Sequence, residues 1–463
     1  MPDLHSSKTP DATAEQREQS HGDAPAAGAS APRPKCFLPW LTIVLRVLTG
    51  ALFVLSGWAK AVDPWGSVFK IEEYFAAWGW YDFPHSLITV GAFLLGSYEF
   101  VCGALLMLGC YRRGSVTALS LLMMLMLPLS LYIAIENPVS DCGCFGDAFV
   151  ISNTATFVKN VVICAALAYL LPFNKRVTTF VTTYAQWIVG GVLTLYILLI
   201  GLIGYNIQPL EDFRRFAPGT SLTGDNDDDD AEEATSQMTF IYERDGEQRQ
   251  FTLDNLPDST WTFVDRLDGP DASASADLLT ITDPETGEDL TEEVLSTPGG
   301  PDLMLVTVPD IADVDLSATY LLNDLDDFVK ARDGKLVMLA GVNATAADLD
   351  AWHDVSMSHY PIYRLDAKTI KELARGTSAL VYVRDGEVVW KRTLNSIAYS
   401  TVTDTPADQL LEMLDPQPVK MLNYLTWATV VILAAVIMLD RTGHLVHIHL
   451  RRRRRARSEG KES

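Results

Sequence analysis

Long apolar runs alternate with polar segments along the chain. A helix that crosses a bilayer needs about 20 mostly apolar residues. Six runs reach this length: Leu38–Lys60, His85–Gly109, Ser115–Ile135, Asn153–Leu171, Thr183–Tyr205 and Met421–Leu439. The pattern therefore predicts an α-helical membrane protein, with a four-helix domain over residues 36–172, a fifth transmembrane helix over 183–205 and a sixth over 421–439.

The polar segment between the fifth and sixth runs has a different pattern. Residues 206–300 are expected to form a linker and a β-rich extension, because alternating residues flank the turn signal Asp245-Gly246. Over residues 301–416 short apolar runs alternate with helical patterns. Strands are expected at Leu303–Val308, Lys335–Gly341, Pro361–Leu365, Ala379–Val383 and Val388–Arg392, and helices at Tyr320–Ala331, Thr345–His353, Lys368–Arg375 and Thr405–Leu414.

This order of strands and helices resembles the thioredoxin fold. Catalytic members carry a Cys-x-x-Cys after an early strand, whereas residues 206–420 contain no cysteine. The thioredoxin-like domain is therefore expected to bind or position a partner rather than to exchange disulfides itself.

Composition separates a membrane part from an acidic aqueous part. The chain has 463 residues, is 48% apolar and carries a formal net charge of -23. Such an acidic surface repels phosphate, which argues against nucleic acid as a partner. Residues 1–35, rich in Ala, Pro and Ser, are predicted to be a disordered cytoplasmic tail.

The basic residues beside the spans predict the orientation. Arg112 and Arg113, Lys175 and Arg176, and the run Arg451–Arg455 all fall on one side of a six-span chain. Lysine and arginine accumulate on the cytoplasmic side. We therefore expect a multi-pass protein of a bacterial cytoplasmic (inner) membrane. Both termini would be cytoplasmic, residues 440–463 would form a basic tail, and the large domain would be extracytoplasmic.

Two cysteines stand one residue apart in a short outer loop with the sequence Ser140-Asp-Cys-Gly-Cys-Phe-Gly-Asp147. Disulfides form and persist in the extracytoplasmic compartment. So small a ring would be labile and would save little chain entropy, which favours a redox pair formed by Cys142 and Cys144 over a structural bridge. A metal site is the alternative, although it would need further ligands such as His85.

Charged residues near or within the spans are further candidates. Lys60 and Lys159 would lie at the depth of the thiols and could stabilise a thiolate, although both could instead extend to the membrane interface. Because charges in hydrocarbon usually pair, Arg46 and Glu99 are predicted to form an intramembrane ion pair. The alternative is a lone Arg46 beside a protonated Glu99.

Several of these motifs resemble one family. Leu45–Lys60 is similar to the first helix of the DoxX and MauE group of small four-helix membrane proteins, and Asp141-Cys-Gly-Cys-Phe-Gly146 closely resembles the MauE signature. MauE is implicated in methylamine dehydrogenase maturation, with a proposed role in disulfide formation. The resemblance implies that Cys142 and Cys144 are the redox pair, but it does not imply that methylamine is the substrate here.

Two functions from different classes follow. The first is a thiol/disulfide redox accessory protein, a component of a thiol-disulfide oxidoreductase system that supports oxidative maturation of exported proteins. Its partners would be an exported client or a thioredoxin-like protein, and the wider family suggests a membrane quinone as electron acceptor. The second is a non-catalytic membrane scaffold or assembly factor whose large domain docks a partner. No Gly-rich nucleotide loop supports a flavin or nicotinamide site.

The predicted orientation has a direct test. An impermeant thiol reagent added to intact cells should label Cys142 and Cys144, because their loop faces outward. Cys110, expected near the cytoplasmic face, should stay unlabelled until the bilayer is breached. Labelling of the loop cysteines only after permeabilisation would contradict the orientation and with it the redox hypothesis.

Overall fold

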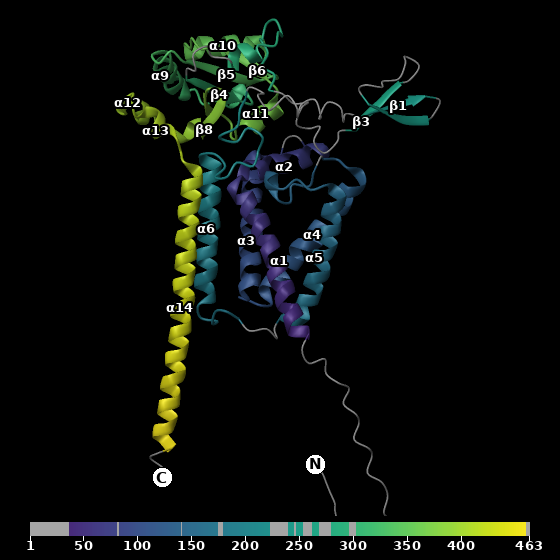
Figure 1. Cartoon of the computed structure of the whole chain (residues 1–463), viewed down its shortest axis with the longest axis vertical. Helices are drawn as coiled ribbons and strands as arrows, with labels where there is room; N and C mark the ends of the chain where they lie inside the picture. Colours follow the sequence, from purple (N-terminus) through teal and green to yellow (C-terminus); the bar gives the residue numbers. More distant parts are fainter. Residues whose placement is uncertain are drawn as a thin grey trace, which may run out of the picture.

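Long helices dominate the computed structural model (Figure 1). The structure describes residues 37–80, 83–139, 141–174, 179–222, 239–244, 247–252, 262–267, 279–295 and 302–459. Within these residues, each of six helices contains a stretch long and apolar enough to cross a membrane, which confirms the predicted spans: α1 (Phe37–Val62), α3 (His85–Leu108), α4 (Gly114–Glu136), α5 (Asn153–Phe173), α6 (Gln186–Asn206) and α14 (Pro418–Glu459). The chain is a multi-pass membrane protein.

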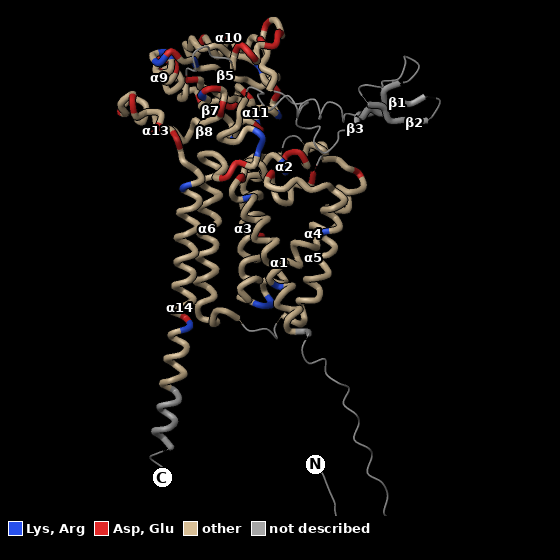
Figure 2. Tube along the Cα trace, viewed as in Figure 1, with Lys and Arg blue, Asp and Glu red and all other residues tan. Residues whose placement is uncertain are grey.

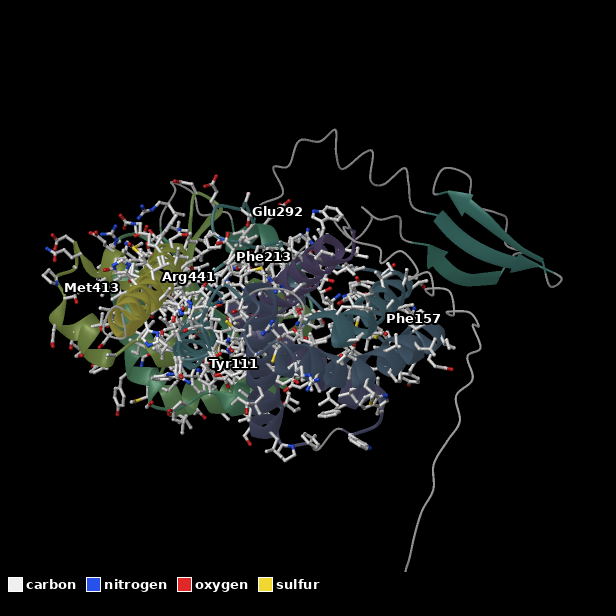
Figure 3. All side chains as sticks on the ribbon, turned by 90° about the horizontal axis from the view of Figure 1, so that it is seen from below. Tyr111, Phe157, Phe213, Glu292, Met413 and Arg441 are labelled. Carbon is white, nitrogen blue, oxygen red and sulfur yellow. The ribbon has the colours of Figure 1, made fainter. Side chains whose placement is uncertain are left out.

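The first four spans pack together, and the last two form a pair beside them. Helix α1 packs closely on α3, and α4 packs on α5. Helix α14 lies along α6, on the other side of α1 and α3 from α4 and α5 (Figure 1). Seen from below, Phe157 of α5 and Arg441 of α14 accordingly lie toward opposite sides of the helices (Figure 3).

Helix α14 is longer than the predicted sixth span. It has 42 residues and continues beyond Leu439, so the basic segment is a helical continuation as far as Glu459. Its position on α6 is fixed by hydrogen bonds from the Thr182 backbone N–H to Asp440 Oδ2 (2.8 Å) and from Arg441 Nε to the Phe180 carbonyl (3.0 Å).

Glycines bring the backbones of α1 and α3 into contact. A Cβ built at Gly50 would lie 2.7 Å from the carbonyl oxygen of Gly103, and one at Gly57 would lie 2.5 Å from that of Gly96. Small residues allow such close helix approach in membranes, where packing replaces hydrophobic burial. The two contacts also define the register of the antiparallel helices.

The segment between α1 and α3 contains helix α2 (Pro64–Ala77). The Asp63 side chain caps it by accepting from the Gly66 N–H (3.0 Å), and Pro64 occupies its first turn, where a missing N–H costs nothing. The helix lies across the end of the membrane domain and buries Trp65 and Val68 (Figure 1).

An α/β domain lies beyond α2, at the opposite end of the spans from the end of α14 (Figure 1). Its five-stranded sheet has the order β6-β5-β4-β7-β8. The three strands β4, β5 and β6 are parallel, whereas β7 runs antiparallel to β4 and β8 to β7. The predicted strands are confirmed as β4 (Leu303–Val308), β5 (Lys335–Gly341), β6 (Ile362–Leu365), β7 (Ala379–Arg384) and β8 (Glu387–Thr393).

Helices cover both faces of this sheet, so the buried strands are apolar on both sides. Met304 and Val306 belong to the core beneath α9 (Ala318–Lys330) and α10 (Ala346–Ser356). Leu303 and Leu305 belong to the other core, which includes residues of α8 (Thr291–Leu295) and α11 (Ala367–Leu373).

The predicted closing helix over Thr405–Leu414 is confirmed only in its second half, as α13 (Leu410–Leu414). A separate short helix, α12 (Tyr399–Asp404), precedes it. Pro406 lies between them, and the proline ring disfavours helical backbone in the residue before it.

The β-rich extension contains the predicted hairpin. Strands β1 (Thr239–Arg244) and β2 (Glu247–Thr252) pair in antiparallel register, and β3 (Thr262–Leu267) pairs with the other edge of β1. The tail over residues 1–35 lies outside the described residues.

Charge follows this division of the molecule. Acidic and basic residues are concentrated in the α/β domain and near the ends of the helices, and the middles of the spans carry few (Figure 2). The few charges within the spans are therefore candidates for function.

The close contact between α1 and α3 predicts a selective sensitivity to added volume. Gly57→Ala should destabilise the membrane domain by about 1–3 kcal/mol, the usual range for overpacking, because its Cβ would meet the α3 backbone. Gly91→Ala in α3 is the matched control, since no atom lies within 4 Å of its added Cβ. Denaturant titration of the purified protein in detergent checks this. Equal unfolding free energies for the two variants would contradict the packing argument.

Candidate functional site

A cavity of about 230 Å³ lies inside the membrane domain, next to the thiol pair. Much of its wall is apolar and comes from Leu52, Phe53, Leu95, Leu122, Met123, Met126, Leu129 and Ile163. Its polar lining includes both loop cysteines together with Ser56, Lys60, Lys70, Tyr74, Glu99, Lys159 and Asn160. The cavity therefore presents an apolar wall and reactive groups to the same space.

The backbone of the thiol loop is held by groups from α1 and α2. The carbonyl oxygen of Cys144 accepts hydrogen bonds from Ser56 Oγ (2.6 Å) and from Lys60 Nζ. The carbonyl oxygen of Cys142 accepts one from the Tyr74 hydroxyl (2.9 Å).

A salt bridge on the neighbouring turn of α2 holds the start of the loop. Lys70 Nζ lies 3.0 Å from Asp141 Oδ2, and Asp141 Oδ1 accepts from the Gly143 N–H (2.8 Å). Lys70 and Tyr74 stand four residues apart on α2 and so share one face of that helix.

The two thiols are in contact. Cys142 Sγ and Cys144 Sγ lie 3.2 Å apart, and both cysteines are free. Gly143 between them has φ of +63°, a conformation that side chains disfavour, and a Cβ there would lie 2.6 Å from Lys70 Cγ. The close pairing of the sulfur atoms therefore depends on glycine at the central position.

The surroundings of the pair give the two thiols different pKa values. A hydrogen bond from the Cys142 thiol lowers the pKa of Cys144 to about 6; the positive charges of Lys159 and Lys60 also lower it, against the opposing effect of burial. The same hydrogen bond and burial raise the pKa of Cys142. Of the two thiols, Cys144 is therefore the one that loses its proton more readily.

The predicted Arg46–Glu99 ion pair is wrong. Glu99 instead pairs with Lys60, with 2.7 Å between Oε2 and Nζ, and Oε2 also lies 2.8 Å from Ser56 Oγ. Lys60 and Glu99 are both buried. The same lysine thus binds a membrane carboxylate and the carbonyl of Cys144.

The register of α1 against α3 explains the correction. Because Gly57 lies beside Gly96 and Gly50 beside Gly103, Glu99 is level with residues close to Ser56, whereas Arg46 is level with the end of α3. Arg46 is 1% exposed and lies against Gly109, with Nε and Nη1 unpaired among the described residues.

Lys159 also lies near the pair. Its ammonium group stands 4.5 Å from the centroid of the Phe145 ring, and its charge favours the thiolates of both cysteines. The structure thus places Lys60 and Lys159 near the thiol pair, while their role as thiolate stabilisers stays a prediction.

Sequence reasoning did not identify Ser56, Lys70 or Tyr74 as part of the site. The signal for Lys70 and Tyr74 is their spacing on a helix that begins at Asp63-Pro64, a capping pattern that was not recognised. No group of three or more His, Cys, Asp or Glu side chains that could hold a metal ion occurs among the described residues.

Comparison with known proteins now assigns the membrane part. The family model described as "Methylamine utilisation protein MauE" matches residues 38–173. Residues 38–173 are therefore similar to the MauE family of membrane proteins. The match covers the first four spans and the thiol loop. A second model, "Domain of unknown function (DUF8463)", matches residues 236–269. Neither the curated proteins nor the solved structures give a match.

The hydrogen bond between the thiols can be tested through the reactivity of Cys144. Alkylation of reduced protein by iodoacetamide, followed by peptide mass spectrometry, should give a half-maximal rate near pH 6. In Cys142→Ala the pKa should rise toward about 8.5, the value of a free thiol, and the rate at pH 6 should fall more than tenfold.

Cys142→Ser is the matched control, because its hydroxyl can still donate to the thiolate. Its profile should lie between those of the wild type and Cys142→Ala. Identical profiles for the two variants would show that Cys142 does not stabilise the Cys144 thiolate.

Proposed function

We propose that the protein is a membrane thiol/disulfide redox accessory protein that supports oxidative maturation of exported proteins. The observation that carries the proposal is the contact of the Cys142 and Cys144 sulfur atoms, 3.2 Å apart, on a loop fixed beside a cavity. The MauE match supports an accessory role like that of the methylamine utilisation proteins, with a client that can differ.

The exchange step follows from the unequal thiols. In the oxidised pair, a client thiolate attacks Cys142 Sγ, and Cys144 leaves as the thiolate, since the sulfur with the lower pKa is the better leaving group. A second client thiolate then attacks the client sulfur in the mixed disulfide and releases Cys142. One client dithiol becomes a disulfide and the pair gains two electrons; one client proton ends on Cys142, and the other goes to solvent because Cys144 leaves as the thiolate.

The surrounding residues act on this step in two ways. Hydrogen bonds from Ser56 and Lys60 fix the Cys144 carbonyl, which keeps the sulfur atoms within a short movement of the disulfide length of about 2.05 Å. Lys60 and Glu99 are joined by a hydrogen bond beside the pair. This Lys60–Glu99 pair can hold the proton that is released when the thiol pair is reoxidised.

The cavity fits a quinone as the electron acceptor. Its wall is largely apolar, as an isoprenoid quinone requires, and hydrogen-bonding groups of Lys60, Ser56 and Asn160 also line it. A bound quinone would accept two electrons from the pair together with two protons, one from the Cys142 thiol and one from solvent. A separate thioredoxin-like protein is the alternative acceptor.

The α/β domain serves as a docking or positioning module. A central strand with a parallel and an antiparallel neighbour supports its assignment as thioredoxin-like, and it contains no cysteine. We place it, with the thiol loop, on the extracytoplasmic side of a bacterial inner membrane. Both termini are then cytoplasmic, consistent with the basic residues at the far ends of the helices (Figure 2).

Trapping tests the proposed function. In Cys144→Ser the pair can no longer close, so oxidation with diamide should join Cys142 and a client thiol in a mixed disulfide that Cys144 cannot resolve, seen as a higher-mass band on nonreducing gels, with the client identified by mass spectrometry. Cys142→Ser should give much less of this adduct. The double variant Cys142→Ser/Cys144→Ser should stay folded and inserted while the client accumulates in reduced form.

The scaffold hypothesis predicts a different result. If the cysteine pair is passive, the client will be oxidised to the same extent in the wild type and in the double serine variant. Equal client oxidation would overturn the redox function and leave the α/β domain as a docking surface.

A further inference from the structure

The α/β domain reaches the thiol loop through one buried arginine. Arg375 follows α11 and is 5% exposed. Its Nε and Nη2 donate to Asp63 Oδ2 (3.0 and 2.8 Å), and Nη2 also donates to Asp147 Oδ2. Asp147 stands three residues after Cys144, so a residue of the α/β domain holds the far end of the thiol loop.

The position of Arg375 is itself fixed on several sides. Gln208, just after α6, accepts from the Arg375 N–H (3.0 Å) and donates to its carbonyl oxygen (2.7 Å). Arg375 Nη1 donates to the Lys371 carbonyl (3.0 Å), and the guanidinium lies 5.4 Å from the ring centroid of Phe69 on α2. All three side-chain nitrogen atoms therefore have partners.

Asp63 links the same arginine to the other contacts of the loop. Its Oδ1 caps α2 through the Gly66 N–H, while its Oδ2 accepts from Arg375. Helix α2 carries Lys70 and Tyr74, which hold Asp141 and the Cys142 carbonyl. Arg375 thus contacts Asp147 at the end of the thiol loop and Asp63 at the start of α2. Helix α2 in turn holds the beginning of that loop.

The charged residues next to Arg375 are paired with one another. Asp212 is satisfied by Arg214 (2.7 Å) and by Lys391 (2.9 Å). The Arg375 guanidinium is left to the carboxylates of Asp63 and Asp147. The Asp147 side chain is 41% exposed and is held in place by its ion pair with the buried Arg375, so loss of Arg375 should release Asp147 from its present position.

We propose that Arg375 is a positioning residue for the thiol pair: through Asp147 it fixes the loop in the geometry that joins Cys142 to Cys144, and so couples the α/β domain to the redox site. This inference rests on the proposed redox function. It gives the cysteine-free domain a role in thiol chemistry besides docking a client.

The reactivity of Cys144 reports on this geometry. The titratable groups that interact with its sulfur are Cys142, Lys159, Lys60, Glu99 and Tyr74. A loop released at Asp147 would hold the thiols less closely and would weaken the hydrogen bond that favours the Cys144 thiolate. Loss of Arg375 should therefore move the pH profile of Cys144 alkylation upward.

The experiment is a double-mutant cycle on the full-length protein in detergent, with Arg375→Gln, Asp147→Asn and the double variant. Each single variant should raise the midpoint of Cys144 alkylation by about one pH unit, which is about fivefold slower reaction at pH 6. The double variant should add little, because both changes remove one contact. Arg375→Lys, which keeps the charge, should recover part of the rate.

Arg332→Gln is the control for general damage to the domain. Arg332 Nε binds Asp302 Oδ2 at 2.7 Å in the same α/β domain, so its loss should leave the alkylation profile unchanged. An unchanged profile in Arg375→Gln would overturn the proposal. The proposal would also be overturned if the shift in the double variant equalled the sum of the two single shifts, because Arg375 would then act on Cys144 independently of Asp147.

This outcome is independent of the trapping experiment. Alkylation reports the geometry of the pair whether or not a client exists. A shifted profile in Arg375→Gln with no trapped client would support the positioning role and count against the redox function. A trapped client together with an unchanged alkylation profile in Arg375→Gln would support the redox function and count against the positioning role.

Discussion

The site depends on a lysine that is held inside the membrane domain by a carboxylate. Lys60 is buried, and the cost of burying its charge is offset by Glu99 at 2.7 Å. Once fixed there, the ammonium group also binds the Cys144 carbonyl. The ion pair that offsets the cost of burying the Lys60 charge thus also determines where the thiol loop lies.

The rest of the site surrounds this fixed point. Glycines let α1 approach α3, which brings Lys60 to Glu99. The cap at Asp63 starts α2 at the right place for Lys70 and Tyr74 to reach the loop. Features that lie far apart in sequence therefore all hold the thiol loop, through the carbonyl groups of Cys142 and Cys144 and the carboxylate of Asp141.

Much of the fold could be predicted from the sequence, because it depends on local patterns. The six spans are continuous apolar runs, and strands such as Leu303–Val308 and Lys335–Gly341 are short runs bounded by polar residues. The thiol pair could be identified from its spacing. Helix α2 was missed because its cap was not recognised.

The pairing of charges could not be predicted in the same way. Depth along a helix suggested Arg46 for Glu99, but the partner is decided by the register of two antiparallel helices, which local sequence does not contain. Arg375 and Asp63 are 312 residues apart, and their contact depends on how the α/β domain sits on the membrane domain. Such contacts follow from tertiary packing and leave no local pattern.

The α/β domain is anchored at both ends. It leaves the membrane after α6, which ends at Asn206, and returns through α14, which begins at Pro418 and packs along α6. Two adjacent anchors confine the domain to a small volume above the thiol loop, so its local concentration at that loop is far higher than that of any free protein. A single arginine can therefore engage the loop persistently, without the extensive interface that two separate molecules would need.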